Sequence, residues 1–193
     1  MRKIILASAS KARKQLLRQI GLKFESARSS AKEARKLIGS CEKLVMDNAR
    51  RKALDVASRY VSGLVISADT VVLVGDKIIG KPKNMRDAAR TLRLLSRRPQ
   101  WVYSGLAVLD IATGRLATDF EKTKVYMHPL TDEEIKSYFR RTSPLDKAGS
   151  FDIQGLGGIF IRKVEGCYYN VVGLPLAKLA KILKRFGVDI FNV

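Results

Sequence analysis

Residues 145–176 read LDKAGSFDIQGLGGIFIRKVEGCYYNVVGLPL, and the rest of the chain can be organised around them. Six of the chain's fourteen glycines lie in this stretch: Gly149, Gly155, Gly157, Gly158, Gly166 and Gly173. Glycine loses the most backbone entropy on folding, so a cluster of glycines indicates positive φ angles or a close approach of the backbone. Two β-prone runs, IFIRKV and CYYNVV, flank Glu165-Gly166, and this pattern predicts a hairpin.

The glycine-rich segment has two interpretations. Polar Asp146, Lys147 and Gln154 stand at its mouth, where the backbone would suit a cradle for a flat or anionic ligand. The alternative is a turn-rich piece of sheet in which the glycines serve packing. Composition alone does not separate the two.

The chain is long enough for one domain, or two small halves, with a real core. Its 193 residues are 46% apolar and 28% charged, with only 5 prolines, which indicates a globular soluble protein. No apolar run approaches the roughly 20 residues that span a bilayer. The apolar run Ile4–Ala7 after the basic start is too short for a signal peptide, so we expect a cytoplasmic protein.

The two cysteines, Cys41 and Cys167, do not make a disulfide framework, and we expect buried or half-buried thiols. His128 is the only histidine and the chain has no CxxC pair, which excludes the usual zinc sites.

The net charge is the strongest compositional feature: 37 Lys and Arg against 18 Asp and Glu give +19. Such a charge favours anionic partners, and nucleic acid is the obvious hypothesis. The basic residues follow helical patterns, without an aromatic-interleaved platform or a recognition-helix motif, in 11–18, 32–52, 83–98 and 136–141. The alternative is a solvated basic surface, which would also steer a nucleotide.

The chain begins with a strand, a serine turn and a helix. Residues 3–7 (KIILA) are apolar after Lys3, as in a buried strand, and residues 11–20 have helical spacing with Gly21 as the stop. Ser10 can cap this helix, and its first N–H groups beside Arg13 would form an anion site.

A short strand at 22–26 and a loop at 27–40 carrying Glu33 come next. A helix is predicted over 42–60, with an apolar face made by Leu44, Val45, Ala49, Ala53, Leu54 and Ala57. Lys52 lies next to Arg50 and Arg51, and by itself it reads as a solvated lysine.

Asp69 is the strongest single catalytic candidate. It follows the buried strand at 64–68, and VVLV comes directly after Asp69-Thr70. A carboxylate between two apolar β runs is costly to bury unless it is paired, hydrogen-bonded or bound to a metal. We interpret Asp69 as a metal ligand or as a base for water, and a turn-forming aspartate is the alternative.

Residues 75–81 (GDKIIGK) fit the first seven positions of the phosphate-loop pattern GxxxxGK[ST], but we reject the match. Pro82 stands where the pattern needs Ser or Thr, and KII is β-prone. Gly75-Asp76 is instead predicted to turn a hairpin. Lys81 would end the returning strand and point toward Asp69, an arrangement that is useful only for an anionic ligand.

The remaining pattern completes an α/β fold with a mixed twisted sheet flanked by helices. It predicts a helix at 84–96, strands at 100–111 and 116–126, a helix capped by Thr131 to Glu134, and a last helix between Pro175 and Gly187. Loops at the mouth of the sheet would hold 8–13, Glu33, Asp69, Lys81 and Gln154. Two carboxylates among several cations suit hydrolysis of a phosphate ester, with Mg²⁺ on the acids.

Several motifs together carry a resemblance: LASAS, KAR-KQLL, NARRKA, SADTVV, GKP and the block at 145–176. From Leu6 to Leu176 the chain resembles the Maf family of nucleoside triphosphate pyrophosphatases, which is named for septum formation. ADT together with IQGLGG is similar to the branch that acts on dTTP and UTP.

The resemblance implies one domain over 1–193, with two lobes around a central cleft, and a homodimer. It also implies cleavage between the α and β phosphates with Mg²⁺ or Mn²⁺, giving a nucleoside monophosphate and pyrophosphate. The matching positions are Asp69 as proton acceptor and metal ligand; Ser8, Ser10 and Arg13 as the phosphate-binding turn; Glu33, Lys52 and Lys81 as polar and metal-binding residues; and Thr70 and Gln154 for base choice.

One position departs from the family pattern. SPRR usually follows the second serine position, whereas here Ser10-Lys11-Ala12-Arg13 stands, so Ala12 replaces an arginine that bears on specificity. Lys11 or Lys14 supplies charge without arginine's bidentate fork. Two alternatives therefore stay open: a house-cleaning pyrophosphatase for inosine or xanthosine triphosphate, and a basic nucleic-acid-binding protein.

Overall fold

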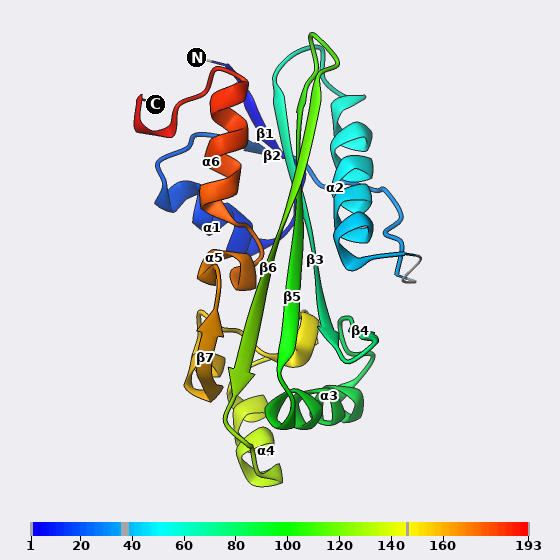
Figure 1. Cartoon of the computed structure of the whole chain (residues 1–193), viewed down its shortest axis with the longest axis vertical. Coiled ribbons are helices and arrows are strands. Elements are labelled where there is room, and N and C mark those ends of the chain that lie inside the picture. Colours follow the sequence, from blue (N-terminus) through cyan, green and yellow to red (C-terminus); the bar gives the residue numbers. More distant parts are fainter. Residues whose placement is uncertain (1, 36–38, 146, 193) are drawn as a thin grey trace. The chain divides into compact units, whose positions relative to one another are not determined.

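The computed structural model describes the chain except for residues 1, 36–38, 146 and 193 (Figure 1). Its elements are, in order, β1 (Ile4–Leu6), α1 (Lys11–Gln19), β2 (Glu25–Ser26), α2 (Cys41–Ala57), β3 (Leu64–Val74), β4 (Lys77–Ile79), α3 (Met85–Arg97), β5 (Gln100–Asp110), β6 (Leu116–Met127), α4 (Asp132–Arg141), η1 (Ala148–Ser150), η2 (Leu156–Phe160), β7 (Ile161–Glu165), α5 (Tyr168–Val172), α6 (Leu176–Arg185) and η3 (Ile190–Asn192).

The strands of the described residues form one seven-stranded sheet in the order β2-β1-β3-β5-β6-β7, with β4 paired to β3. β1 is parallel to β2 and β3, whereas the pairs β3–β4 and β6–β7 are antiparallel. The predicted mixed sheet of an α/β protein is therefore confirmed.

The chain divides into two compact units. The first comprises Met1–Thr70, Ser104–Glu121 and Gly173–Val193, and the second Val71–Tyr103 and Lys122–Val172. β3, β5 and β6 contribute residues to both units.

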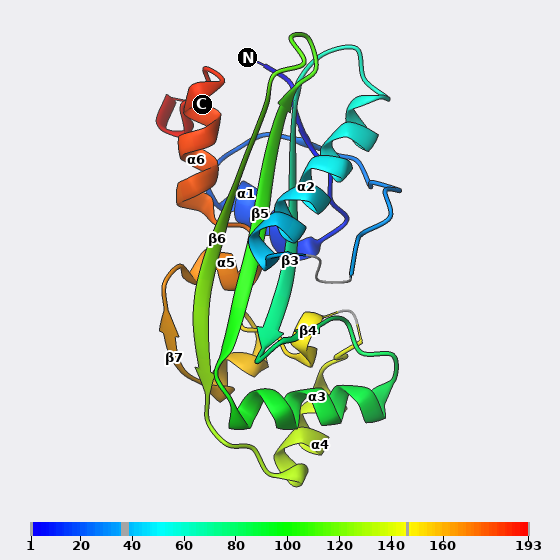
Figure 2. The same cartoon turned by 45° about the vertical axis from the view of Figure 1, so that its right-hand side comes forward.

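The first unit packs helices on both faces of its strands. Figures 1 and 2 show α2 on one side of β3 and β5, with α1 and α6 on the other. The core under α2 is made by Ile5, Ala7, Ala49, Ala53, Val56, Val65, Ala107 and Leu109. Leu54 was expected on this face, but it is 43% exposed, because it lies one position past Ala53 and points away from the sheet.

The second unit has its own core around Tyr138 and Phe160, whose rings make an edge contact with centroids 4.9 Å apart. α3 begins after Asn84, whose side chain caps it, and Thr131 and Glu134 form the predicted capping box of α4. The β3–β4 hairpin turns at Gly75-Asp76 as expected. The returning strand ends at Ile79, so Lys81 lies just beyond it.

Only half of the predicted 145–176 hairpin forms. Ile161–Glu165 is a strand paired with β6, whereas Tyr168–Val172 is helical and not a strand. Tertiary contacts explain the difference. Buried Asn170 donates from Nδ2 to the carbonyl of Val102 and to Oγ1 of Thr123, both at 2.9 Å, and Cys167 also bonds Oγ1 of Thr123. A helical turn brings positions 167 and 170 to one side, which overrides β propensity.

The glycines of this segment serve different needs. Gly149, Gly166 and Gly173 have positive φ angles. At Gly157 a Cβ atom would lie 2.8 Å from the carbonyl oxygen of Asp152, so here the close backbone approach comes from the chain itself. This contact supports the packing interpretation for Gly157. The ligand cradle stays a prediction, and Asp146, one of its expected residues, lies outside the described residues.

Two further expectations can be compared with the structure. Cys41 is a buried free thiol and Cys167 a half-buried one, as predicted. None of the helices within the described residues is long and apolar enough to cross a membrane.

Candidate active site

Asp69 lies within β3, which runs unbroken through it, so the turn-forming alternative is wrong. Its side chain is 8% exposed. Lys52 donates from Nζ to Oδ1 of Asp69 at 2.6 Å, and Asn48 donates from Nδ2 to Oδ2 at 2.9 Å. Both oxygens of the buried carboxylate therefore have hydrogen-bond donors, which offsets the cost of its burial.

Lys52 is not the solvated lysine that its arginine neighbours suggested. Its side chain is only 11% exposed, and Nζ lies 2.6 Å from Oε1 of Glu33 as well as 2.6 Å from Oδ1 of Asp69. The reason is its place on α2, because Ala49 and Ala53 beside it pack against the sheet and turn this face inward. Arg50 and Arg51 lie on the exposed side of the same helix.

Glu33 joins the cluster from the loop after β2. Burial raises its pKa and is the largest single influence. The hydrogen bond from Lys52 and the positive charges of Lys52, Arg13 and Arg35 together outweigh it, so the pKa of Glu33 is lowered. Glu33 is therefore ionised at neutral pH, and its carboxylate and that of Asp69 both lie against one nitrogen atom.

Asn48 was missed by the sequence analysis. It is 2% exposed and donates from Nδ2 to the carbonyl of Ala34 at 2.9 Å, while its Oδ1 accepts from the N–H of Ala34 at 2.8 Å. It therefore joins the backbone next to Glu33 to Asp69. The sequence does hold one indication of this role: Asn48 is a polar amide on the apolar face of α2, one helical turn before Lys52.

The serine turn has the predicted structure. Oγ of buried Ser8 accepts from the N–H of Ser10 at 3.2 Å, and Oγ of Ser10 accepts from the N–H of Arg13 at 3.4 Å, which caps α1. A capped helix start that follows a buried strand is a place where backbone N–H groups can receive an anion.

The guanidinium of Arg13 fixes the surroundings of Asp69. It donates from Nε to the carbonyl of Gly173 at 2.9 Å, from NH1 to the carbonyl of Ala68 at 2.8 Å and from NH2 to Oγ1 of Thr70 at 3.0 Å. Burial lowers the pKa of Arg13, and the charges of Asp69 and Glu33 partly restore it. Arg13 thus holds the residues on both sides of Asp69, and its role toward phosphate stays a prediction.

The structure gathers seven of the predicted site residues in the first unit: Ser8, Ser10, Arg13, Glu33, Lys52, Asp69 and Thr70. Lys81 and Gln154 are exposed residues of the second unit, and their roles stay predictions. Ala12, the departure from the family pattern, is half-buried on α1.

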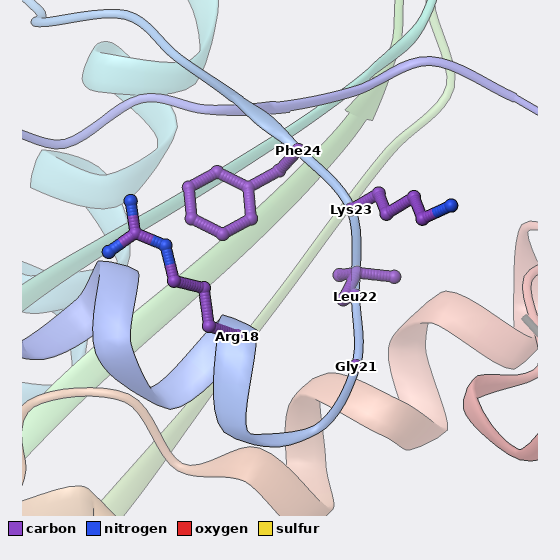
Figure 3. A pocket seen from close by; sticks show the side chains of 5 residues that line it. All are labelled: Arg18, Gly21, Leu22, Lys23 and Phe24. Carbon is purple, nitrogen blue, oxygen red and sulfur yellow. The ribbon is translucent and has the colours of Figure 1, made fainter.

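Two pockets of the first unit lie away from these residues. One of about 350 Å³ is lined by Arg18, Gly21, Leu22, Lys23 and Phe24 (Figure 3), with the guanidinium of Arg18 5.9 Å from the ring centroid of Phe24. The other, of about 340 Å³, lies between the N-terminal strand and the segment after α6. Neither is lined by a candidate site residue.

The family model described as Maf-like protein matches residues 3–186. The chain belongs to the Maf family. It is 46% identical to a dTTP/UTP pyrophosphatase of Methanosarcina barkeri, over 100% of this chain and 98% of that protein. The dTTP/UTP pyrophosphatases of Desulforamulus reducens (45% identity, 98% and 100% coverage) and Carboxydothermus hydrogenoformans (44%, 96% and 99%) are also similar over their length.

The donor set of this Maf chain can be compared with what a divalent metal needs. Among the described residues, no group of three or more His, Cys, Asp or Glu side chains could hold a metal ion. Mg²⁺, however, commonly takes one or two carboxylates and fills its other positions with water and substrate phosphates. The carboxylates of Glu33 and Asp69 both lie 2.6 Å from Nζ of Lys52, and two carboxylates fit a magnesium site of this kind.

Proposed function

We propose that this chain hydrolyses dTTP and UTP between the α and β phosphates, giving the nucleoside monophosphate and pyrophosphate. The observation that carries the proposal is the cluster in which buried Lys52 holds the buried carboxylate of Asp69 and the more exposed carboxylate of Glu33 together. The full-length relatives named dTTP/UTP pyrophosphatase support the reaction and the substrates.

Asp69 is the base in this mechanism. Its carboxylate accepts a proton from the water that attacks the α phosphorus. Lys52 and Asn48 hold the two oxygens by hydrogen bonds, so the carboxylate is oriented before substrate arrives. Ser8, Ser10 and the first N–H groups of α1 receive phosphate oxygens, because a helix N-terminus favours anions.

Glu33 and Asp69 are the residues that would hold Mg²⁺ or Mn²⁺. Such an ion, when bound, supplies a Lewis acid that neutralises charge developing on phosphate oxygens. Lys52 holds the two carboxylates close to each other, because its Nζ lies 2.6 Å from an oxygen of each.

The remaining parts of the proposal come from the family resemblance. Lys81 assists at the phosphates, Thr70 and Gln154 influence base choice, and the protein works as a homodimer with a cleft between two lobes. The net charge of +19 would speed capture of a triphosphate.

Pyrophosphate release tests the proposal. The protein is incubated with Mg²⁺ and, in turn, dTTP, UTP, CTP, GTP and the triphosphates of inosine and xanthosine, and dTTP and UTP are expected to react fastest. Asp69→Asn is expected to lose at least ~100-fold in rate. Asp119→Asn, which changes a half-buried carboxylate outside the site, is the matched control and should keep the rate.

Three outcomes would contradict the proposal. Release from no nucleotide, with Asp69→Asn equally silent, would remove the pyrophosphatase activity. Faster release from inosine or xanthosine triphosphate would favour the house-cleaning alternative. An Asp69→Asn enzyme as active as the control would remove Asp69 from the mechanism.

A further inference from the structure

The face of β6 that points away from the core of the second unit carries polar and aromatic side chains. Successive residues of a strand alternate between the two faces of a sheet. Thr123, Val125 and Met127 are buried on the core side. Lys122, Lys124 and Tyr126 therefore point to the opposite side.

Aromatic and cationic side chains alternate on this face. Nζ of Lys122 lies 5.6 Å from the ring centroid of Trp101, and Nζ of Lys124 lies 5.3 Å from that ring and 5.3 Å from the ring of Tyr126. The guanidinium of Arg162 lies 5.6 Å from the Tyr126 ring. The order is cation, ring, cation, ring, cation, across β5, β6 and β7.

We call these residues, with their neighbours on β7, the basic-aromatic face: Trp101, Lys122, Lys124, Tyr126, Arg162, Lys163 and Glu165. It holds four cations against one carboxylate. Its residues lie outside the four basic ranges noted in the sequence, and strand pairing joins residues that are up to 61 positions apart, from Trp101 to Arg162.

We propose that the basic-aromatic face binds single-stranded nucleic acid. Unpaired bases stack on aromatic rings whatever their sequence, and lysine and arginine neutralise the phosphates between them. Lysines at alternate positions of a strand stand about 7 Å apart, a separation that suits neighbouring phosphates of an extended chain. This proposal does not depend on the pyrophosphatase reaction.

The charges and rings together favour a single strand over a duplex. A duplex hides the faces of its bases, so rings on a sheet surface gain nothing from it. Lys122, Arg162 and Lys163 are exposed, and Trp101 and Tyr126 are half-buried, so the rings are held in place while the cations lie at the surface, where phosphates can reach them.

Trp101 is the only tryptophan of the chain and reports on stacking directly. The probes are oligothymidylate and oligouridylate of about 12 nucleotides, within the usual site size for single-strand binding. We expect quenching of Trp101 fluorescence together with binding seen by anisotropy of the labelled oligonucleotide. A duplex of the same length should bind at least about tenfold more weakly and leave the fluorescence unchanged.

The variants separate stacking from charge. Trp101→Ala is expected to weaken binding about tenfold and Trp101→Phe, which keeps a ring, by less than about threefold. Lys122→Gln with Lys124→Gln should lower the slope of log affinity against log salt by about 1.4, since each phosphate contact contributes roughly 0.7. Lys181→Gln with Lys184→Gln removes two exposed charges from α6 and is the matched control.

The proposal is overturned if the α6 control weakens binding as much as the Lys122 and Lys124 variant, because net charge alone would then explain it. It is equally overturned if oligoglutamate binds as tightly as the oligonucleotides, which would indicate an acidic protein partner. Displacement of the oligonucleotide by excess dTTP would place its binding at the nucleotide site. Should Trp101→Ala fail to fold, Trp101→Phe and the lysine variants decide the result.

Discussion

The candidate active site and the basic-aromatic face hold charged side chains in opposite ways. In the site, Lys52 and Asp69 are nearly excluded from water, and each contacts an oppositely charged partner at 2.6 Å. On the face, Lys122 and Arg162 are exposed and lie over rings. A buried charge that loses its partner is left unsolvated, whereas an exposed charge returns to water. Burial therefore fixes the site residues to one another, while exposure leaves the face accessible to a partner.

Lys52→Met should give the largest effect. It removes the cation that contacts both Asp69 and Glu33 and leaves a buried carboxylate unpaired. We expect a loss of about 3–5 kcal/mol in the free energy of unfolding and a fall in pyrophosphate release of at least ~100-fold. Urea denaturation and the pyrophosphate assay measure the two quantities.

Lys181→Met is the control for this substitution, because Lys181 is exposed. It should change the free energy of unfolding by less than about 0.5 kcal/mol. Equal losses in the two variants would show that burial does not distinguish the site from the surface.

Asn48→Ala should come next. It leaves the N–H and the carbonyl of Ala34 without their side-chain partner and removes the donor to Oδ2 of Asp69. We expect a loss of about 1–3 kcal/mol in stability and about tenfold in kcat, with KM nearly unchanged.

Asn170→Ala separates positioning from folding. Asn170 is fully buried in the second unit and also donates two hydrogen bonds from Nδ2, so its loss should cost similar stability. It should leave kcat nearly unchanged. An equal fall in kcat in both variants would make Asn48 a structural residue only.

The sequence predicts the site residue whose burial has a local signal, and it does not predict those that only packing turns inward. Asp69 was found because a carboxylate between two apolar strands is costly to bury, and that cost is local in the sequence. Lys52 was misread because its neighbours Arg50 and Arg51 are solvated, and only the packing of α2 turns it inward. Asn48 was missed for the same reason, since its partners Ala34 and Asp69 are distant in the chain.

Elements held by local chemistry were predicted well, and elements held by distant partners were not. The cap by Ser10, the capping box of α4 and the turn at Gly75-Asp76 need only nearby residues, and all three were confirmed. The β-prone residues of α5 predict a strand, because nothing in that segment of the sequence indicates that Asn170 contacts Thr123. The basic-aromatic face likewise exists only once β5, β6 and β7 are paired.

The double variant Lys122→Gln with Lys124→Gln tests the other region of the comparison, the basic-aromatic face. Cation–π contacts at exposed sites contribute little, so we expect a change of less than about 1 kcal/mol in the free energy of unfolding. Pyrophosphate release should be unchanged, while the salt dependence of oligonucleotide binding should fall. A stability loss as large as that of Lys52→Met would mean that these lysines hold the sheet together and are not available to a partner.

Glu165→Gln gives the smallest expected effect. Hydrogen bonds from Lys163 and Tyr126 and the charges of Lys163 and Lys124 lower the pKa of Glu165 from its ordinary value of 4.5. The ionised form therefore stabilises the fold above pH 4.5, and this contribution is lost as the pH falls through the lowered pKa. Over the same range the basic-aromatic face loses its one negative charge.

Protonation of Glu165 should change the affinity for the oligonucleotide in the direction opposite to its effect on the stability of the fold. Ionised Glu165 repels phosphates, so the affinity for oligothymidylate, whose bases do not protonate in this range, should rise as the pH falls below 4.5. Glu165→Gln should bind roughly two- to threefold more tightly at pH 7 and lose that pH dependence. Anisotropy at several pH values measures both. An affinity that falls with acid in the wild-type protein, or a variant with unchanged affinity, would show that the phosphates do not pass near Glu165, and the path of the strand would then have to run over Lys122 and Trp101 alone.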